Sequence, residues 1–152
     1  MNVARSRDSA AAALLAMLIV GEAPAAEGPV DADTRQAIEV DASARARIRA
    51  EMRELLTALQ GLADALAADD MRAAAKAARS AGMQAVGPID PKFQAQLPPE
   101  FRKLGFGMRG EFDALAADAD KLADRNRALR QFGGVLQRCV ACHSTYQLRE
   151  RP

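Results

Sequence analysis

Residues 129–146 read LRQFGGVLQRCVACHSTY and carry both cysteines of the 152-residue chain together with its only histidine. Apolar and reactive side chains recur in this stretch at alternating steps of three and four, which is the period of one helical face. They are Leu129, Phe132, Leu136, Cys139, His143 and Tyr146. The spacing predicts a terminal helix whose inward face holds Cys139 and His143.

Residues 139–143, CVACH, have the C-x-x-C-H spacing of a covalent c-type haem attachment site. At about 100° per residue, Cys139, Cys142 and His143 fall within a sector of roughly 100° on a helix. One face can therefore offer two thiols that add to the haem vinyl groups and an imidazole that binds the iron. We predict one haem c, with Cys139 and Cys142 as thioether anchors and His143 as the axial iron ligand.

The sequence disfavours other roles for the two cysteines. A redox dithiol is disfavoured because no βαβ pattern surrounds the motif, and a zinc site lacks a second Cys/His pair to complete four ligands. A disulfide within one helical turn would constrain very little of the chain. A lone histidine on an apolar face is usually a core residue, but here it directly follows the C-x-x-C pair.

The first 25 residues have the features of a secretory signal peptide. Arg5 and Arg7 supply a positive n-region, and residues 10–20 form an apolar run that is short for a bilayer span. Residues 23–25, APA, offer a small-x-small cleavage site. We expect residues 1–25 to be removed on export and residues 26–152 to form one domain in the periplasm, without a membrane attachment.

Charge and composition argue against several classes of function. The chain has 21 basic and 20 acidic side chains, a formal net charge of +1 and no basic run, which gives no reason to expect a nucleic-acid partner. The sequence also lacks a Ser/His/Asp set, a phosphate-binding loop and a second histidine that could activate peroxide. We therefore expect that the protein is not an enzyme.

The first half of the domain is predicted to be helical. A capping pair of Asp33 and Gln36 is expected to open a helix that runs to about Ala67, and Asp69 or Asp70 is expected to cap the next one. The inward seam of the first helix consists of Ile48, Met52, Leu55, Leu59, Leu62 and Leu66.

The third helix is expected to begin at Pro98 or Pro99, after an irregular crossover loop at 84–97. Its seam consists of Phe101, Leu104, Met108, Phe112, Leu115 and Ala119. Asp120 or Asp124 should then open the last helix.

The last helix carries the haem motif and is expected to end near Arg149. We find no segment of useful length with a strand period. The predicted fold class is all-α, an up-down-up-down four-helix bundle with covalent haem on the C-terminal helix.

The end of the chain resembles that of the class II c-type cytochromes, which comprise the cytochrome c-prime family and its low-spin relatives. The matching residues are Phe132, Gly133, Gly134, Val135, the 139–143 motif and Tyr146, as in that family's F-G-x-V…C-x-x-C-H-x-x-Y-R ending. Gln147 departs from the pattern, since Arg is common there. Only the last twenty residues match specifically, and the rest of the resemblance is length, topology and periodicity.

That resemblance implies one of two arrangements opposite His143. In the low-spin relatives a Met from the first helix is the sixth iron ligand, and Met52 is the candidate here, followed by Met108. In the other arrangement an apolar side chain, here Leu55 or Leu56, blocks this position and leaves an iron that binds small gases. The arginine that the family often places beside the haem propionates has only an approximate match in Arg49.

Three hypotheses of function follow. The first is a soluble periplasmic monohaem cytochrome with His143 and Met52 as axial ligands, which transfers single electrons between redox partner proteins. The second is a five-coordinate haem protein that binds NO or CO. The third omits haem and makes Cys139 and Cys142 a redox or metal-binding pair. Members of the family often form homodimers through their first two helices, so the resemblance also suggests a homodimer for this chain.

Overall fold

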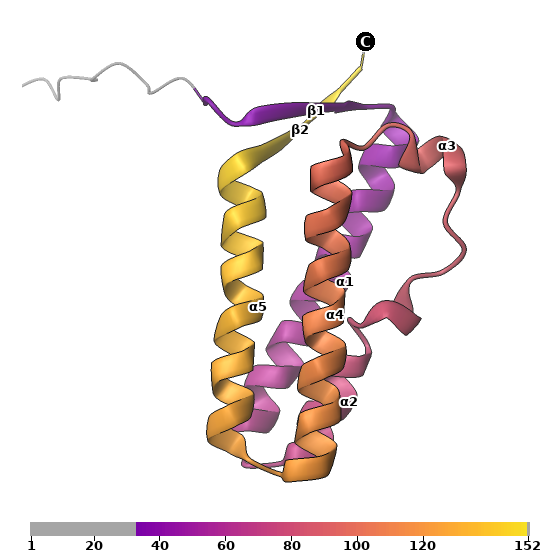
Figure 1. The fold of residues 1–152 in the computed structure, drawn as a ribbon. Coiled ribbons are helices and arrows are strands. Elements are labelled where there is room, and N and C mark those ends of the chain that lie inside the picture. Colours follow the sequence, from indigo (N-terminus) through magenta and orange to yellow (C-terminus); the bar gives the residue numbers. More distant parts are fainter. Residues whose placement is uncertain (1–32, 152) are drawn as a thin grey trace, which may run out of the picture. The chain divides into compact units, whose positions relative to one another are not determined.

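The computed structural model describes residues 33–151 (Figure 1). These residues form a mainly helical domain in which helices pack against one another, together with one small parallel sheet. The predicted signal peptide, residues 1–25, lies outside the described residues. Within the described range, no helix is both long and apolar enough to cross a membrane.

Four main helices, of which α2 is much shorter than the other three, build most of this domain. They are α1 (Ala42–Ala67), α2 (Met71–Arg79), α4 (Pro99–Leu122) and α5 (Arg125–Thr145). α2 packs against both α1 and α4, and α4 packs against α5, whereas α1 and α5 approach each other at few positions. The prediction of a mainly helical domain with four main helices is confirmed.

Three of the predicted helix starts are also confirmed. The Asp70 carboxylate accepts a hydrogen bond from the amide of Ala73 at 2.8 Å and caps α2, and Asp124 caps α5 in the same way. Pro99 is the first residue of α4, where a missing N–H costs no hydrogen bond. Asp69 has a left-handed backbone, with φ of 56°, which makes the turn between α1 and α2 short.

The first helix begins later than predicted, because Gln36–Val40 form the strand β1. Burial alternates along β1, and Ile38 is only 2% exposed, which is a strand period and not a helical one. Asp41 caps α1 and accepts a hydrogen bond of 2.7 Å from the Ala44 amide. The predicted cap at Asp33 is therefore wrong.

The last helix ends earlier than predicted, because Tyr146–Glu150 form a second strand, β2, which pairs with β1 in parallel. The register aligns Gln36 with Tyr146. α5 therefore ends at Thr145 and not near Arg149, and the chain runs from the last helical turn directly into the sheet (Figure 1). The prediction of a chain without strands is wrong for the same reason.

The predicted crossover loop is irregular, but it contains two short helical segments. They are η1 (Met83–Ala85) and α3 (Pro91–Gln94). Asp90 caps α3 by accepting a hydrogen bond of 2.9 Å from the Lys92 amide. The loop runs beside α4 and leads into its first turn (Figure 1).

Two apolar clusters lie at different levels along α1. The larger one joins α1, α2, α4 and α5, and its most deeply buried large side chains are Leu62, Leu66, Phe112, Leu115 and Val135. The smaller one joins β1 to the first turns of α1 through Ile38, Val40, Ala44 and Ile48. Met52 is partly buried and packs against both clusters, so it lies where they meet.

The buried stripe of α5 differs from the predicted one. Ala128 and Val135 are buried, whereas Leu129 and Leu136 are 40% and 39% exposed. Two stripes that start at adjacent residues, 128 and 129, both have steps of three and four, so the period alone selected the wrong one. Phe132 and Cys139 belong to both stripes and pack against the larger cluster as predicted.

The packing of β1 predicts a measurable loss of stability. Val40 is 0% exposed, so replacing Val40 with Ala removes buried methyl groups and should lower the free energy of unfolding by about 2 kcal/mol. The matched control is Val140→Ala, because Val140 is 65% exposed and should lose less than about 0.5 kcal/mol. Urea denaturation followed by circular dichroism measures both. Equal losses in the two variants would contradict the packing of β1.

Candidate cofactor site

Cys139, Cys142 and His143 line one cavity of about 410 Å³. Its walls come from α1, α4, α5 and the loop residues 86–97. Both cysteines are free and half-buried, and His143 is exposed. This volume falls within the range of small-molecule sites, roughly 300–1,000 Å³.

The surroundings of the two thiols do not favour dithiol redox chemistry. Burial raises the pKa of the Cys139 thiol, and the nearby Glu111 carboxylate raises this pKa further. Burial, and to a smaller extent Cys139, raise the pKa of the Cys142 thiol. A reactive C-x-x-C pair depends on a lowered thiol pKa, because the thiolate is the nucleophile.

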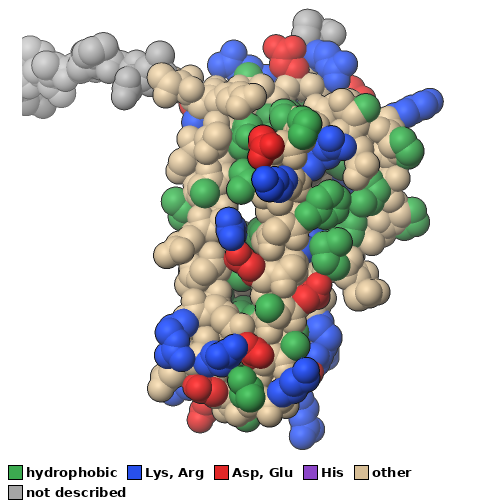
Figure 2. All heavy atoms as spheres, in the orientation of Figure 1, with side chains coloured by type: hydrophobic (Ala, Val, Ile, Leu, Met, Phe, Trp, Pro, Cys, Tyr) green, Lys and Arg blue, Asp and Glu red, His purple; other side chains and the backbone are tan. Residues whose placement is uncertain are grey.

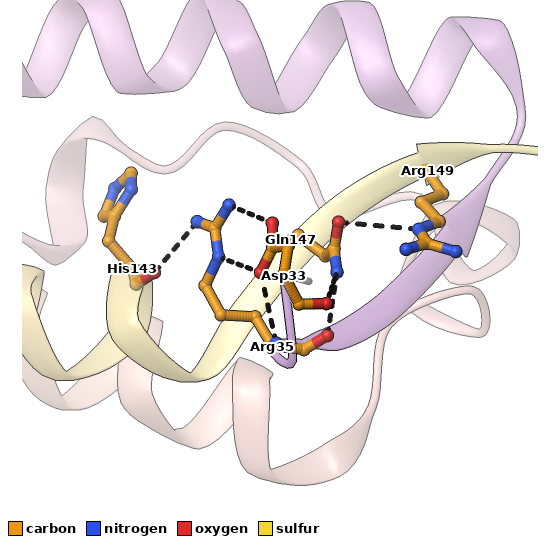
Figure 3. A network of polar contacts seen from close by, with 5 residues as sticks. All are labelled: Asp33, Arg35, His143, Gln147 and Arg149. Atoms are coloured by element: carbon orange, nitrogen blue, oxygen red, sulfur yellow. Dashed lines mark hydrogen bonds and ion pairs between the residues drawn. The ribbon is translucent and has the colours of Figure 1, made fainter. Parts of the chain in front are cut away.

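The backbone of His143 is held by a residue from the other end of the described chain. Arg35 donates a hydrogen bond from Nη1 to the His143 carbonyl oxygen at 3.0 Å, while its Nε donates to Asp33 at 2.9 Å. Figure 3 shows that the imidazole of His143 points away from this contact. Arg35 therefore fixes the last turn of α5 and leaves both ring nitrogens of His143 free of it.

Gln147 extends this contact to the sheet. Its side-chain Nε2 donates to the carbonyl oxygen of Arg35 at 2.9 Å, and Arg149 donates to Gln147 Oε1 at 3.4 Å (Figure 3). We call Asp33, Arg35 and Gln147 the terminal clasp. Sequence reasoning missed the clasp, because the contacts of Arg35 with His143 and Gln147 join residues that are more than 100 positions apart.

α1 supplies the wall that carries the predicted sixth ligand. Met52 lines the same cavity as His143, and so does Met108 from α4, which is 9% exposed. Met71 and Met83, the other two methionines of the described chain, are outside the lining. The two candidates that the sequence ranked first are thus the two methionines that share the cavity with His143.

Most of the remaining lining is apolar. Leu55, Leu56 and Leu59 line it from α1, and Gly105 lines it from α4. Ile89 from the loop also lines the cavity and is 37% exposed. Figure 2 shows apolar side chains gathered over α4 and the neighbouring loop. Two thiols, an imidazole, thioethers and apolar walls fit a haem.

The arginines that line the cavity do not include Arg49, which the sequence suggested as the partner of the haem propionates. Arg49 is exposed and does not line the cavity. Arg47 from α1 and Arg102 and Arg109 from α4 do line it. Any anionic group of a ligand would therefore meet arginines of α4 as well as of α1.

No family model, no curated protein and no solved structure matches this chain.

The contacts of the clasp should lower the pKa of Asp33. Hydrogen bonds from the side chain and the backbone of Arg35 lower the Asp33 pKa from 3.8 to about 2. Replacing Arg35 with Ala should return this pKa toward 3.8, as measured by NMR of the carboxyl carbon against pH. The folded-state pKa is lowered, so the contact stabilises the fold fully above pH 3.8 and its contribution is lost as the pH falls through about 2.

The control for this titration is Arg49→Ala, which changes an exposed arginine outside the clasp. It should leave the Asp33 pKa where it is in the unchanged protein. An Asp33 pKa near 3.8 in the unchanged protein would show that the Asp33–Arg35 contact of the clasp does not form.

Proposed function

We propose that the protein is a monohaem c-type cytochrome that transfers single electrons. Cys139 and Cys142 anchor the haem through thioether bonds, His143 binds the iron from α5, and Met52 binds it from α1. The observation that supports this proposal is that these four side chains, from two helices, line one mostly apolar cavity.

When bound, the haem supplies one iron that accepts and releases a single electron. The residues of the chain determine how readily it does so. A thioether ligand such as Met52 raises the reduction potential and leaves no open position for a gas. The leucines of α1 that line the cavity make its wall apolar, and low polarity around the iron also tunes its potential.

The proposal assigns the chain to the class II c-type cytochromes, with their up-down-up-down four-helix bundle. The support is the F-G-x-V…C-x-x-C-H…Y ending together with the four main helices. Gln147, the departure from the family's pattern, has a use in this chain, because its side chain bonds β2 to the carbonyl of Arg35.

An exported protein is the setting that this chemistry requires, because c-type haem attachment is completed outside the bacterial cytoplasm. Residues 1–25 act as the signal in this proposal, and residues 26–152 form the periplasmic domain. Its partners are redox proteins that deliver and accept electrons. Nucleic acid and membrane binding are not part of the proposal.

The alternative is a five-coordinate haem that binds NO or CO. Leu55 and Leu56 favour it, because both line the cavity on the same helix as Met52 and could cover the iron instead. In that arrangement Met52 only fills space between the two apolar clusters, as methionine often does.

Replacing Met52 with Ala separates the two functions. If Met52 is the sixth ligand, the matured protein is low-spin in both oxidation states, and Met52→Ala becomes high-spin and binds CO. Optical spectra of the oxidised and reduced forms, recorded with and without CO, give the result. Met83→Ala is the control, because Met83 is 41% exposed and lies outside the cavity.

Two results would argue against Met52. A low-spin spectrum that Met52→Ala leaves unchanged, but that Met108→Ala converts to high-spin, moves the sixth ligand to α4. A high-spin resting protein that takes up CO without any substitution favours the gas-binding alternative.

A further inference from the structure

The cavity has an excess of positive charge. Among the described residues, its lining includes four arginines, Arg47, Arg102, Arg109 and Arg138, but only one carboxylate, Glu51. An apolar cavity with this balance suits a ligand that is mostly apolar and carries negative groups. The four arginines are not equivalent, because three of them already interact with other groups of the described chain.

Arg47, Arg109 and Arg138 already have partners. Arg47 Nε lies 3.2 Å from Glu51, and the Arg47 guanidinium also covers the ring of Phe93 at 4.3 Å. Arg109 lies 3.7 Å from Glu51 and donates to the Ala81 carbonyl at 3.2 Å. Arg138 donates to Glu111 at 2.7 Å.

Arg102 is different. Its Nε is buried without a hydrogen-bond partner, and within residues 33–151 no carboxylate forms an ion pair with it. A buried N–H without an acceptor is costly and rare in folded proteins. An acceptor delivered by a ligand of the cavity removes this cost.

We propose that Arg102 is the carboxylate-binding residue of the cavity and pairs with one propionate of the haem. This rests on the proposed function, since the haem brings the carboxylate. The planar guanidinium donates two parallel hydrogen bonds to a carboxylate, a geometry that lysine cannot reproduce. The assignment moves the propionate contact from α1, where Arg49 is exposed, to α4.

The test is the protonation of the propionates in the full-length, haem-loaded protein. A neighbouring Arg lowers the pKa of a carboxylate by roughly 1–3 units. Replacing Arg102 with Leu should therefore raise the pKa of one propionate by about that amount. The pH dependence of the reduction potential reports this pKa. The potential at neutral pH should also fall, because removing a positive charge favours the oxidised iron.

Two matched variants complete the experiment. Arg102→Lys keeps the charge but loses the paired hydrogen bonds, so it should raise the propionate pKa by less than Arg102→Leu does. Arg49→Leu removes an exposed arginine outside the cavity and should leave the propionate pKa unchanged. If Arg102→Leu does not fold, Arg102→Gln makes the same comparison, because it removes the charge and keeps a polar side chain.

The outcomes distinguish this inference from the proposed function. A haem-loaded Arg102→Leu protein with an unchanged propionate pKa overturns the role of Arg102 and leaves the cytochrome proposal intact. A matured protein that contains no haem overturns both.

Discussion

The length of α2 constrains the whole domain. α2 has 9 residues, or about 14 Å, whereas α1 has 26 residues, or about 39 Å. α2 can therefore cover only part of α1 and α4, and the larger apolar cluster lies at that level, where Ala74, Ala75 and Ala78 of α2 are fully buried. Beyond α2, an irregular loop covers α1 and α4 instead, and the cavity lies there. The site thus occupies the space between the two apolar clusters, with Met52 at their junction.

The parallel pairing of β1 with β2 lies next to the end of α5 that carries Cys142 and His143. β2 leaves directly from the last turn of α5, so the strand pairing and the clasp hold the turn that carries His143. The two ends of the described domain are thereby joined next to the last turn of α5. A rigid backbone at this position matters for the proposed function, because small displacements of an axial ligand change how it binds iron.

The sequence predicted the parts that depend on local signals. Helix starts at Asp70, Pro99 and Asp124 follow from capping and proline chemistry. The C-x-x-C-H spacing singled out Cys139, Cys142 and His143, which line one cavity, and their role as haem ligands stays a prediction. It missed β1 and β2, because each is five residues long and is stabilised by a partner more than 100 residues away. Arg35 and Arg102 were missed for a related reason. The long-range contacts of Arg35 and the place of Arg102 in the cavity lining exist only in the folded chain, and neither residue lies in a recognisable motif.

The central claim is that Cys139 and Cys142 bond covalently to one haem. The most direct measurement is the mass of the full-length gene product after export in a host that matures c-type cytochromes, taken under denaturing conditions. The account predicts a mature chain heavier by one haem, with a Cys139→Ala/Cys142→Ala variant that loses this added mass. A chain of unmodified mass with two titratable thiols would contradict it.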